Sequence, residues 1–220
     1  MIANFEDSLQ EIKSKVSEIN QGLLEANKIL LSALSDCEEE KFMQARAQIK
    51  NISSKTDDID NSIIKVLALY TPEASDLRHV VAYLKITNDL SRACSNTRSF
   101  IRGFTDVCKD VDVETIKEYA VPMQTSTVEA IKLSLSMIHC SDADEIQEIY
   151  NDVLIEENKT DDLYEMVERK LSLQADDGSN SFEKYHKMLR ALRKSGKIAT
   201  RTISMANLLV YAKVGGSFRS

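Results

Sequence analysis

Two carboxylates four residues apart are the clearest candidates for chemistry in this chain of 220 residues. Glu157 and Asp161 lie in a long stretch without proline or glycine, where a helix is expected. Residues i and i+4 share one helix face, about 5–6 Å apart. Carboxylates at that spacing can grip one hard cation or bridge two, so a divalent metal site is the first chemistry to consider.

Two further pairs have the carboxylate-x-x-His spacing of di-iron centres, namely Asp76 with His79 and Glu183 with His186. A ferritin-like centre needs two such pairs at mid-bundle and a glutamate from each of two other helices. Both pairs fall in the first turns of their expected helices and lack identifiable partners, so exposed or capping roles are expected. A carboxylate-bridged helical metalloprotein is kept as an alternative. No phosphate-binding loop or nucleophile elbow is present, and the chain is not expected to be an enzyme.

Composition points to long helices and away from several functional classes. The chain has two prolines, six glycines and no tryptophan, which favours few, long helices. A net charge of −7 argues against nucleic-acid binding, which usually requires a basic face. No segment approaches the roughly 18–20 uncharged apolar residues that span a bilayer, so membrane contact is expected to be peripheral at most.

The cysteines and the N-terminus favour a cytoplasmic protein. No secretory signal precedes the first expected helix. The four cysteines are widely spaced and include no Cys-x-x-Cys pair, so reduced thiols packed as small apolar groups are expected. Those cysteines are Cys37, Cys94, Cys108 and Cys140.

Apolar periodicity near 3.6 residues predicts an all-α protein of six helices. Ser35-Asp36 and Ser141-Asp142 are expected to cap the second and fifth, and Thr71 and Pro72 to open the third. A kink is expected at Pro122, and residues 176–180 form the clearest loop. The approximate ranges are Phe5–Leu34, Asp36–Leu69, Pro72–Val107, Val113–Cys140, Asp142–Leu173 and 181–214.

The third of these segments carries a recognisable pattern. It reads Pro-x-Ala-x-Asp-Leu-Arg over residues 72–78, followed by Leu-Lys-Ile at 84–86 and Asp-Leu at 89–90. This pattern resembles the PhoU family of phosphate-uptake regulators, and residues 210–219 resemble the family's C-termini. The resemblance implies two tandem three-helix bundles, residues 1–110 and 111–220, each expected to have its own core. Leu34-Ser35-Asp36 and Cys140-Ser141-Asp142 are internal correspondences consistent with such a duplication.

The same resemblance implies positions for metal ligands. In the family, an acidic pair on the third helix of each repeat and acidic residues on the second hold metal ions. The corresponding positions here are Ile49, Ser53, Ser91 and Ser95 in the first repeat, and Glu157, Asp161, Arg193 and Lys197 in the second. Serines and basic side chains replace the third-helix carboxylates, so neither a metal nor another cofactor is expected.

The retained acidic pair is expected to form ion pairs instead. Residues that face each other across an antiparallel hairpin lie equally far from its centre along the chain. A hairpin centred on Asp177 puts Glu157 opposite Lys197 and Asp161 opposite Arg193. We therefore expect cross-helix ion pairs at these positions, with Arg193 the stronger partner.

The family resemblance implies a non-enzymatic regulator of phosphate uptake and phosphate-starvation signalling. Its expected partners are a phosphate ABC transporter and a membrane sensor histidine kinase, with homodimers possible. Asp76 and Arg78 are expected to lie on a protein-interaction surface or in a structural seam. The alternative within this fold is an accessory protein of a sodium- or proton-coupled phosphate carrier.

Overall fold

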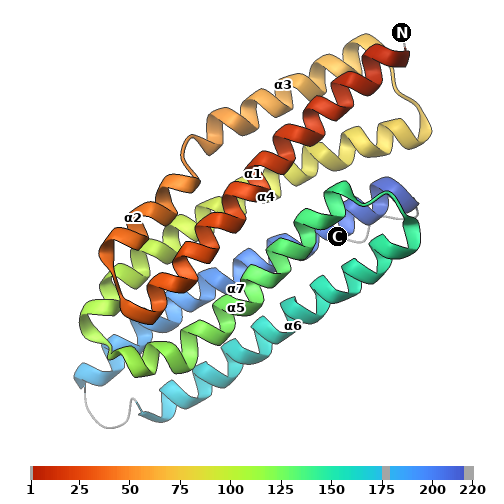
Figure 1. Cartoon of the computed structure of the whole chain (residues 1–220). Coiled ribbons are helices and arrows are strands. Elements are labelled where there is room, and N and C mark those ends of the chain that lie inside the picture. Colours follow the sequence, from red (N-terminus) through yellow and green to blue (C-terminus); the bar gives the residue numbers. More distant parts are fainter. Residues whose placement is uncertain (1, 175–178, 216–220) are drawn as a thin grey trace.

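The computed structural model describes residues 2–174 and 179–215, and the regular secondary structure of this part of the chain is all α-helix (Figure 1). The all-α prediction is confirmed. The predicted second helix is divided in two, and 175–178, which hold most of the predicted loop, lie outside the described residues. The helices are α1 (Ile2–Asp36), α2 (Glu39–Gln48), α3 (Ile52–Tyr70), α4 (Ala74–Asp110), α5 (Val113–His139), α6 (Ala143–Gln174) and α7 (Ser179–Val214).

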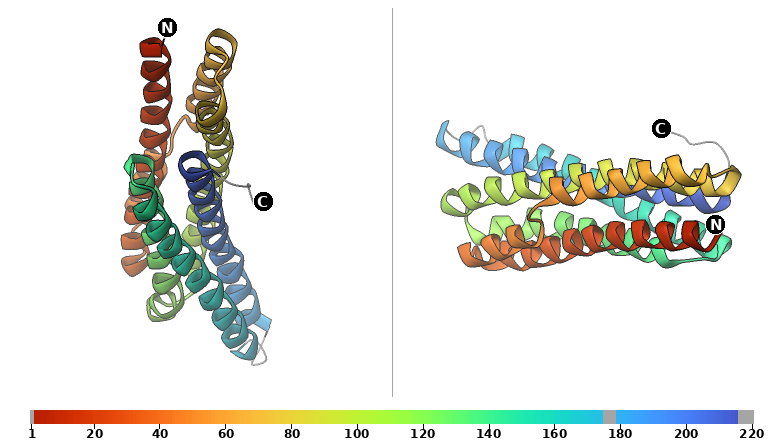
Figure 2. Two further views of the ribbon diagram at one scale, coloured as in Figure 1. Left: turned by 90° about the vertical axis from the view of Figure 1, so that its right-hand side faces the viewer. Right: turned by 90° about the horizontal axis from the view of Figure 1, so that it is seen from above.

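The helices run roughly along one long axis and form an elongated bundle (Figures 1 and 2). Helices α1, α4, α5 and α7 contact one another through the centre, and α4 lies against α7 along much of its length. Helices α2 and α3 lie outside α1 and α4, while α6 covers α5 and α7 on the other side. Among the described residues, no helix combines the length and apolar character that crossing a bilayer requires.

The interruption between α2 and α3 corrects the prediction of one continuous helix. Asn51 has a left-handed backbone, with φ of +56°, which asparagine tolerates better than most residues. The cause lies in α1. A Cβ atom placed on Gly22 would lie 2.9 Å from the carbonyl oxygen of Gln48, so the last turn of α2 presses directly on the α1 backbone. The chain redirects at that contact and keeps Ile49 and Ile52 buried on either side of the break.

Two capping predictions have different outcomes. Asp142 precedes α6, and its Oδ1 accepts hydrogen bonds from the backbone N–H groups of Asp144 and Glu145, both at 2.9 Å. This cap is confirmed. Thr71 is not the N-cap of α4, because it ends α3 with φ of +42°, and Glu73 takes the N-cap position. Pro72 therefore lies in the link between the helices and not in the first turn of α4.

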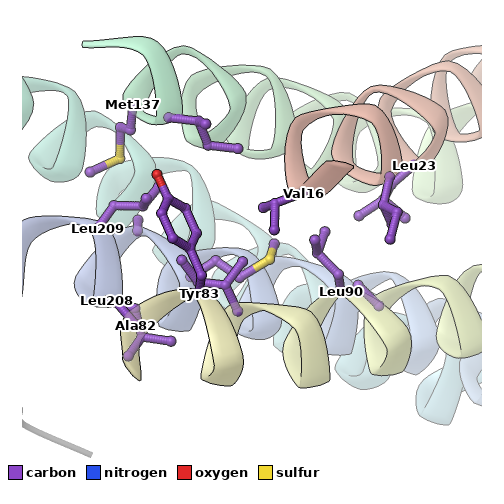
Figure 3. Close-up of a cluster of buried hydrophobic side chains, with 14 of the residues drawn as sticks. Val16, Leu23, Ala82, Tyr83, Leu90, Met137, Leu208 and Leu209 are labelled. Atoms are coloured by element: carbon purple, nitrogen blue, oxygen red, sulfur yellow. The ribbon is translucent and has the colours of Figure 1, made fainter. Parts of the chain in front are cut away.

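The core consists of two apolar clusters stacked along the bundle, and each draws side chains from both halves of the chain. Figure 3 shows the larger cluster, where Ala82 and Tyr83 of the first half lie beside Leu208 and Leu209 of the second. The expectation that each repeat has its own core is therefore wrong. The cause is the arrangement of the four central helices, two from each half, which bury their apolar faces against one another. The boundary near residues 110–111 remains a prediction.

A layer of polar side chains separates the two clusters in all four central helices. We call Asn27, Thr97, Gln124, Thr127 and Ser195 the polar layer, and each is fully buried. Gln124 donates to Asn27 Oδ1 at 2.9 Å and accepts from Ser195 Oγ at 2.8 Å. Asn27 also donates to Thr97 Oγ1 at 3.2 Å, and Ser195 Oγ lies 2.9 Å from Thr127 Oγ1. Mutual hydrogen bonding offsets the cost of burying these groups.

A disulfide joins Cys37 to Cys108, which corrects the expectation of four reduced thiols. The residues are 71 apart in the chain, but α1 and α4 point the same way, so their C-terminal ends meet and the two Cα atoms are 5.7 Å apart. Spacing in the sequence does not reveal that proximity. Cys94 and Cys140 are free and buried, as expected.

Candidate functional site

The first predicted ligand set extends from the link between α2 and α3 to the middle of α4. Ile49 is buried, and its carbonyl accepts a hydrogen bond from Arg98 Nη1 at 3.3 Å. Ser53 and Ser95 are exposed. Ser91 lines a hollow of about 450 Å³ between α3 and α4, together with Thr56, Asp60, Leu84, Lys85, Thr87 and Asn88.

That hollow contains a carboxylate that the sequence analysis overlooked. Asp60 Oδ1 is buried and has no hydrogen-bond partner among the described residues. Burial raises the pKa of Asp60, and the nearby charge of Asp57 adds to the effect. The residue follows Thr56 by four positions, so it shares the face of α3 that meets α4, and this spacing was the signal available in the sequence.

The second predicted site keeps its acidic residues but not the expected register. Glu157 Oε1 accepts a hydrogen bond from Thr200 Oγ1 at 3.3 Å, and none of the ion pairs among the described residues joins Glu157 or Asp161 to a cation. Burial raises the pKa of the Tyr164 hydroxyl, Glu168 adds to the rise, and Arg193 opposes it. Arg193 therefore lies near Tyr164, where the predicted register puts Arg190.

The Glu157–Thr200 hydrogen bond lies three residues further along α7 than the predicted pairing of Glu157 with Lys197. A shift of three residues keeps the same helix face and changes the partners on it, because residues three apart are neighbours on a helix. Equal distance from the turn was therefore not enough to predict which residues of α6 and α7 face each other. Burial raises the pKa of Glu157, as does the charge of Asp161. Burial also raises the pKa of Asp161, with added effects of Asp162 and Glu165. The expected ion pairs do not form in this structure.

The Asp-Leu pair of the recognised pattern has a structural role. Asp89 on α4 is buried and accepts hydrogen bonds from Arg201 Nη1 at 3.1 Å and Ser204 Oγ at 2.7 Å, both on α7. The three residues form a polar clamp in the long α4–α7 contact. Asp89 could have been found as a lone acid on an apolar helix face.

The other two residues of interest in the pattern, Asp76 and Arg78, lie at the start of α4. Asp76 is exposed in the first turn of α4. Arg78 is half-buried and faces the end of α7, where a Cβ atom on Gly215 would lie 3.7 Å from its guanidinium carbon. The Nε of Arg78 is buried and has no hydrogen-bond partner within the described ranges.

The histidine pairs do not form a metal centre. His79 Nδ1 lies 2.8 Å from the carbonyl oxygen of Ser75 in its own helix, and the ring of His186 stacks on Phe182 with centroids 5.8 Å apart. Within residues 2–174 and 179–215, no three His, Cys, Asp or Glu side chains gather closely enough to hold a metal ion. The polar features that the structure does assemble here are helix–helix contacts.

Comparison with known proteins agrees with the pattern in α4. The PhoU domain family matches residues 16–100. The phosphate-specific transport system accessory protein PhoU homolog 1 of Methanothermobacter thermautotrophicus is 19% identical over 212 residues, covering 94% of this chain and 93% of that protein. The match therefore extends through both halves of the chain.

Two solved structures share the fold. The crystal structure of PhoU from Pseudomonas aeruginosa superposes with a TM-score of 0.85 at 19% identity, covering 96% of this chain and all of the other. The phosphate transport system regulatory protein PhoU from Streptococcus pneumoniae has a TM-score of 0.78 at 18% identity, covering 98% and 99%. Taken with the domain match and the pattern of residues 72–90, these likenesses identify the chain as a distant member of the PhoU family.

Proposed function

We propose that this protein is a non-enzymatic regulator of phosphate uptake that works through contacts with other proteins. Its partners are a phosphate ABC transporter and a membrane sensor histidine kinase, and it acts on the cytoplasmic side of the membrane. It lowers phosphate-starvation signalling when phosphate is plentiful. The observation that carries the proposal is the likeness to a phosphate transport accessory protein over 94% of the chain.

The arrangement of polar groups supports binding over catalysis. The buried polar side chains of the polar layer and of the Asp89 clamp are used in holding helices together. The recognised Asp76 and Arg78 lie at the start of α4, where Asp76 is exposed and Arg78 faces the end of α7. We assign this end of the bundle to partner contact.

Co-purification from the native host tests the proposal. A tagged chain is expected to retain subunits of a phosphate ABC transporter, a histidine kinase, or both. Deletion of the gene is expected to raise phosphate-starvation gene expression in phosphate-rich medium. Asp76→Lys should weaken capture and leave the fold intact because the side chain is exposed. The matched charge reversal Asp152→Lys, at an exposed position of α6, should leave capture unchanged. Capture of a sodium- or proton-coupled carrier instead would favour the accessory-protein alternative. The proposal would be contradicted if no transporter or kinase were captured and deletion left phosphate-starvation gene expression unchanged.

We also propose that the protein folds and functions without bound metal. The support is chemical, since Ser91, Ser95, Arg193 and Lys197 replace the carboxylates with which the family holds metal ions. Elemental analysis after purification without added metal should give well below one iron, zinc or manganese per chain. Chelation should leave helicity and thermal stability unchanged, and a large loss of either would contradict metal independence.

A further inference from the structure

We propose that a basic groove across α2, α4 and α7 binds a soluble anion that carries several phosphate groups. The groove consists of two adjoining hollows, one of about 430 Å³ between α4 and α7 and one of about 280 Å³ between α2 and α4. Arg102 and Asp106 line both, so the hollows lie side by side on α4. The cations of the basic groove are Arg46, Arg98, Arg102, Lys187, Arg190 and Lys194.

The close crossing of α4 and α7 creates the larger hollow. A Cβ atom placed on Gly103 would lie 3.0 Å from the Cβ of Ala191, so the two backbones approach closely at this point. Arg102 and Arg190 immediately precede these small residues and line the same hollow. The small residues therefore allow two guanidinium groups from different helices to share one concave surface.

Most of the positive charge in the basic groove is not matched within the protein. Arg46, Arg102, Arg190 and Lys194 form no ion pair or hydrogen bond within the described residues. The other two cations have partners, since Lys187 contacts Asp110 and Glu183 at 3.3 Å each and Arg98 donates to the carbonyl oxygen of Ile49 at 3.3 Å. These unmatched cations gather on a chain whose net charge is −7. Their mutual repulsion is relieved when an anion binds, which gives the groove a free-energy reason to be occupied.

The chemistry of the lining selects phosphate groups. Three of the six cations are arginines on α2 and α4 and a fourth is on α7, and a guanidinium group donates two parallel hydrogen bonds to a phosphate. The combined space is in the range of small-ligand sites, about 300–1,000 Å³. Cations spread along two hollows suit an elongated ligand with several charges better than a single inorganic phosphate. Their concave setting favours a soluble anion over the flat surface of an anionic membrane.

Titration calorimetry with tripolyphosphate tests the proposal directly. Saturable binding near one site per chain is expected, with affinity that falls as salt is raised. The double substitution Arg102→Ala and Arg190→Ala should weaken affinity roughly tenfold or more, as loss of charge-assisted hydrogen bonds requires. The matched control is Arg193→Ala with Lys197→Ala, which removes the same charge from exposed positions outside the groove and should change affinity less than about threefold.

A gain of affinity provides a test that misfolding cannot imitate. Asp106 is the acid shared by both hollows, so Asp106→Asn should strengthen tripolyphosphate binding several-fold. Absence of saturable binding, equal losses in the two double variants, or no gain for Asp106→Asn would each overturn the proposal. Binding to phosphatidylglycerol vesicles without binding to tripolyphosphate would also overturn it and would point to lipid headgroups. These measurements do not depend on the partner contacts proposed above, so either proposal can fail alone.

Discussion

Breaking the Cys37–Cys108 disulfide should lower the stability of the protein more than any single change in a surface ion pair. The bond links residues 71 apart, and closing a loop of that length removes unfolded-state entropy worth about 4 kcal/mol in the chain-entropy description. Measured effects of natural disulfides are commonly about 2–4 kcal/mol. For a chain of this size, that range corresponds to a fall in Tm of roughly 5–15 °C.

Urea unfolding followed by circular dichroism, with and without dithiothreitol, measures the effect. The wild-type midpoint should fall on reduction. The double variant Cys37→Ser with Cys108→Ser should start at the lower value and show no further change, which separates this bond from any other effect of the reductant. Thiol labelling of the unreduced, unfolded wild type should find two reactive thiols, Cys94 and Cys140. Four thiols in protein purified under oxidising conditions, or equal stability with and without reductant, would refute the reasoning.

Three further substitutions test the polar contacts in the bundle. Gln124→Leu should cost about 2–3 kcal/mol of unfolding free energy in urea titrations, because its buried partners on α1 and α7 lose their hydrogen bonds. Arg201→Met should cost roughly 2–3 kcal/mol, because it leaves the buried carboxylate of Asp89 without its cation; a loss below 0.5 kcal/mol would contradict the clamp. Glu157→Gln should raise stability at pH 7 by up to about 1 kcal/mol. The pKa of Glu157 is raised in the folded state, so its ionisation destabilises the fold above that pKa, and the gain should vanish as pH falls below the ordinary glutamate pKa.

Helix content and position follow from local pattern, and most of that could be predicted. The ends of α6 and α7 agree with the expected ranges to within a few residues, because apolar periodicity, the Asp142 cap and Gly215 are local signals. The break at Asn51 could not be predicted, because its cause is the contact of Gln48 with Gly22 on another helix. Long-range contacts of this kind leave little trace in periodicity.

In the candidate sites too, local features could be predicted and long-range contacts could not. The residues at the family's metal positions could be found by counting from a motif, but their partners could not. In the structure Glu157 accepts a hydrogen bond from Thr200, three residues along α7 from the predicted partner Lys197. Residues three apart share a helix face, so no pattern of hydrophobicity distinguishes the two registers. The basic groove is the clearest case, since Arg46, Arg102 and Arg190 come from three helices and meet only after the bundle has formed.

The polar layer has a consequence for how this bundle can move. A purely aliphatic core would accept a helix that slid along its axis by one turn, about 5.4 Å, because one branched side chain replaces another. Here the same slide would carry Asn27 or Gln124 into an apolar cluster and leave its former partners without hydrogen bonds. Axial sliding of α1, α4, α5 or α7 is therefore opposed by several buried hydrogen bonds at once. A force applied at one end of the bundle should therefore tilt or rotate whole helices about this layer and should not slide them past one another.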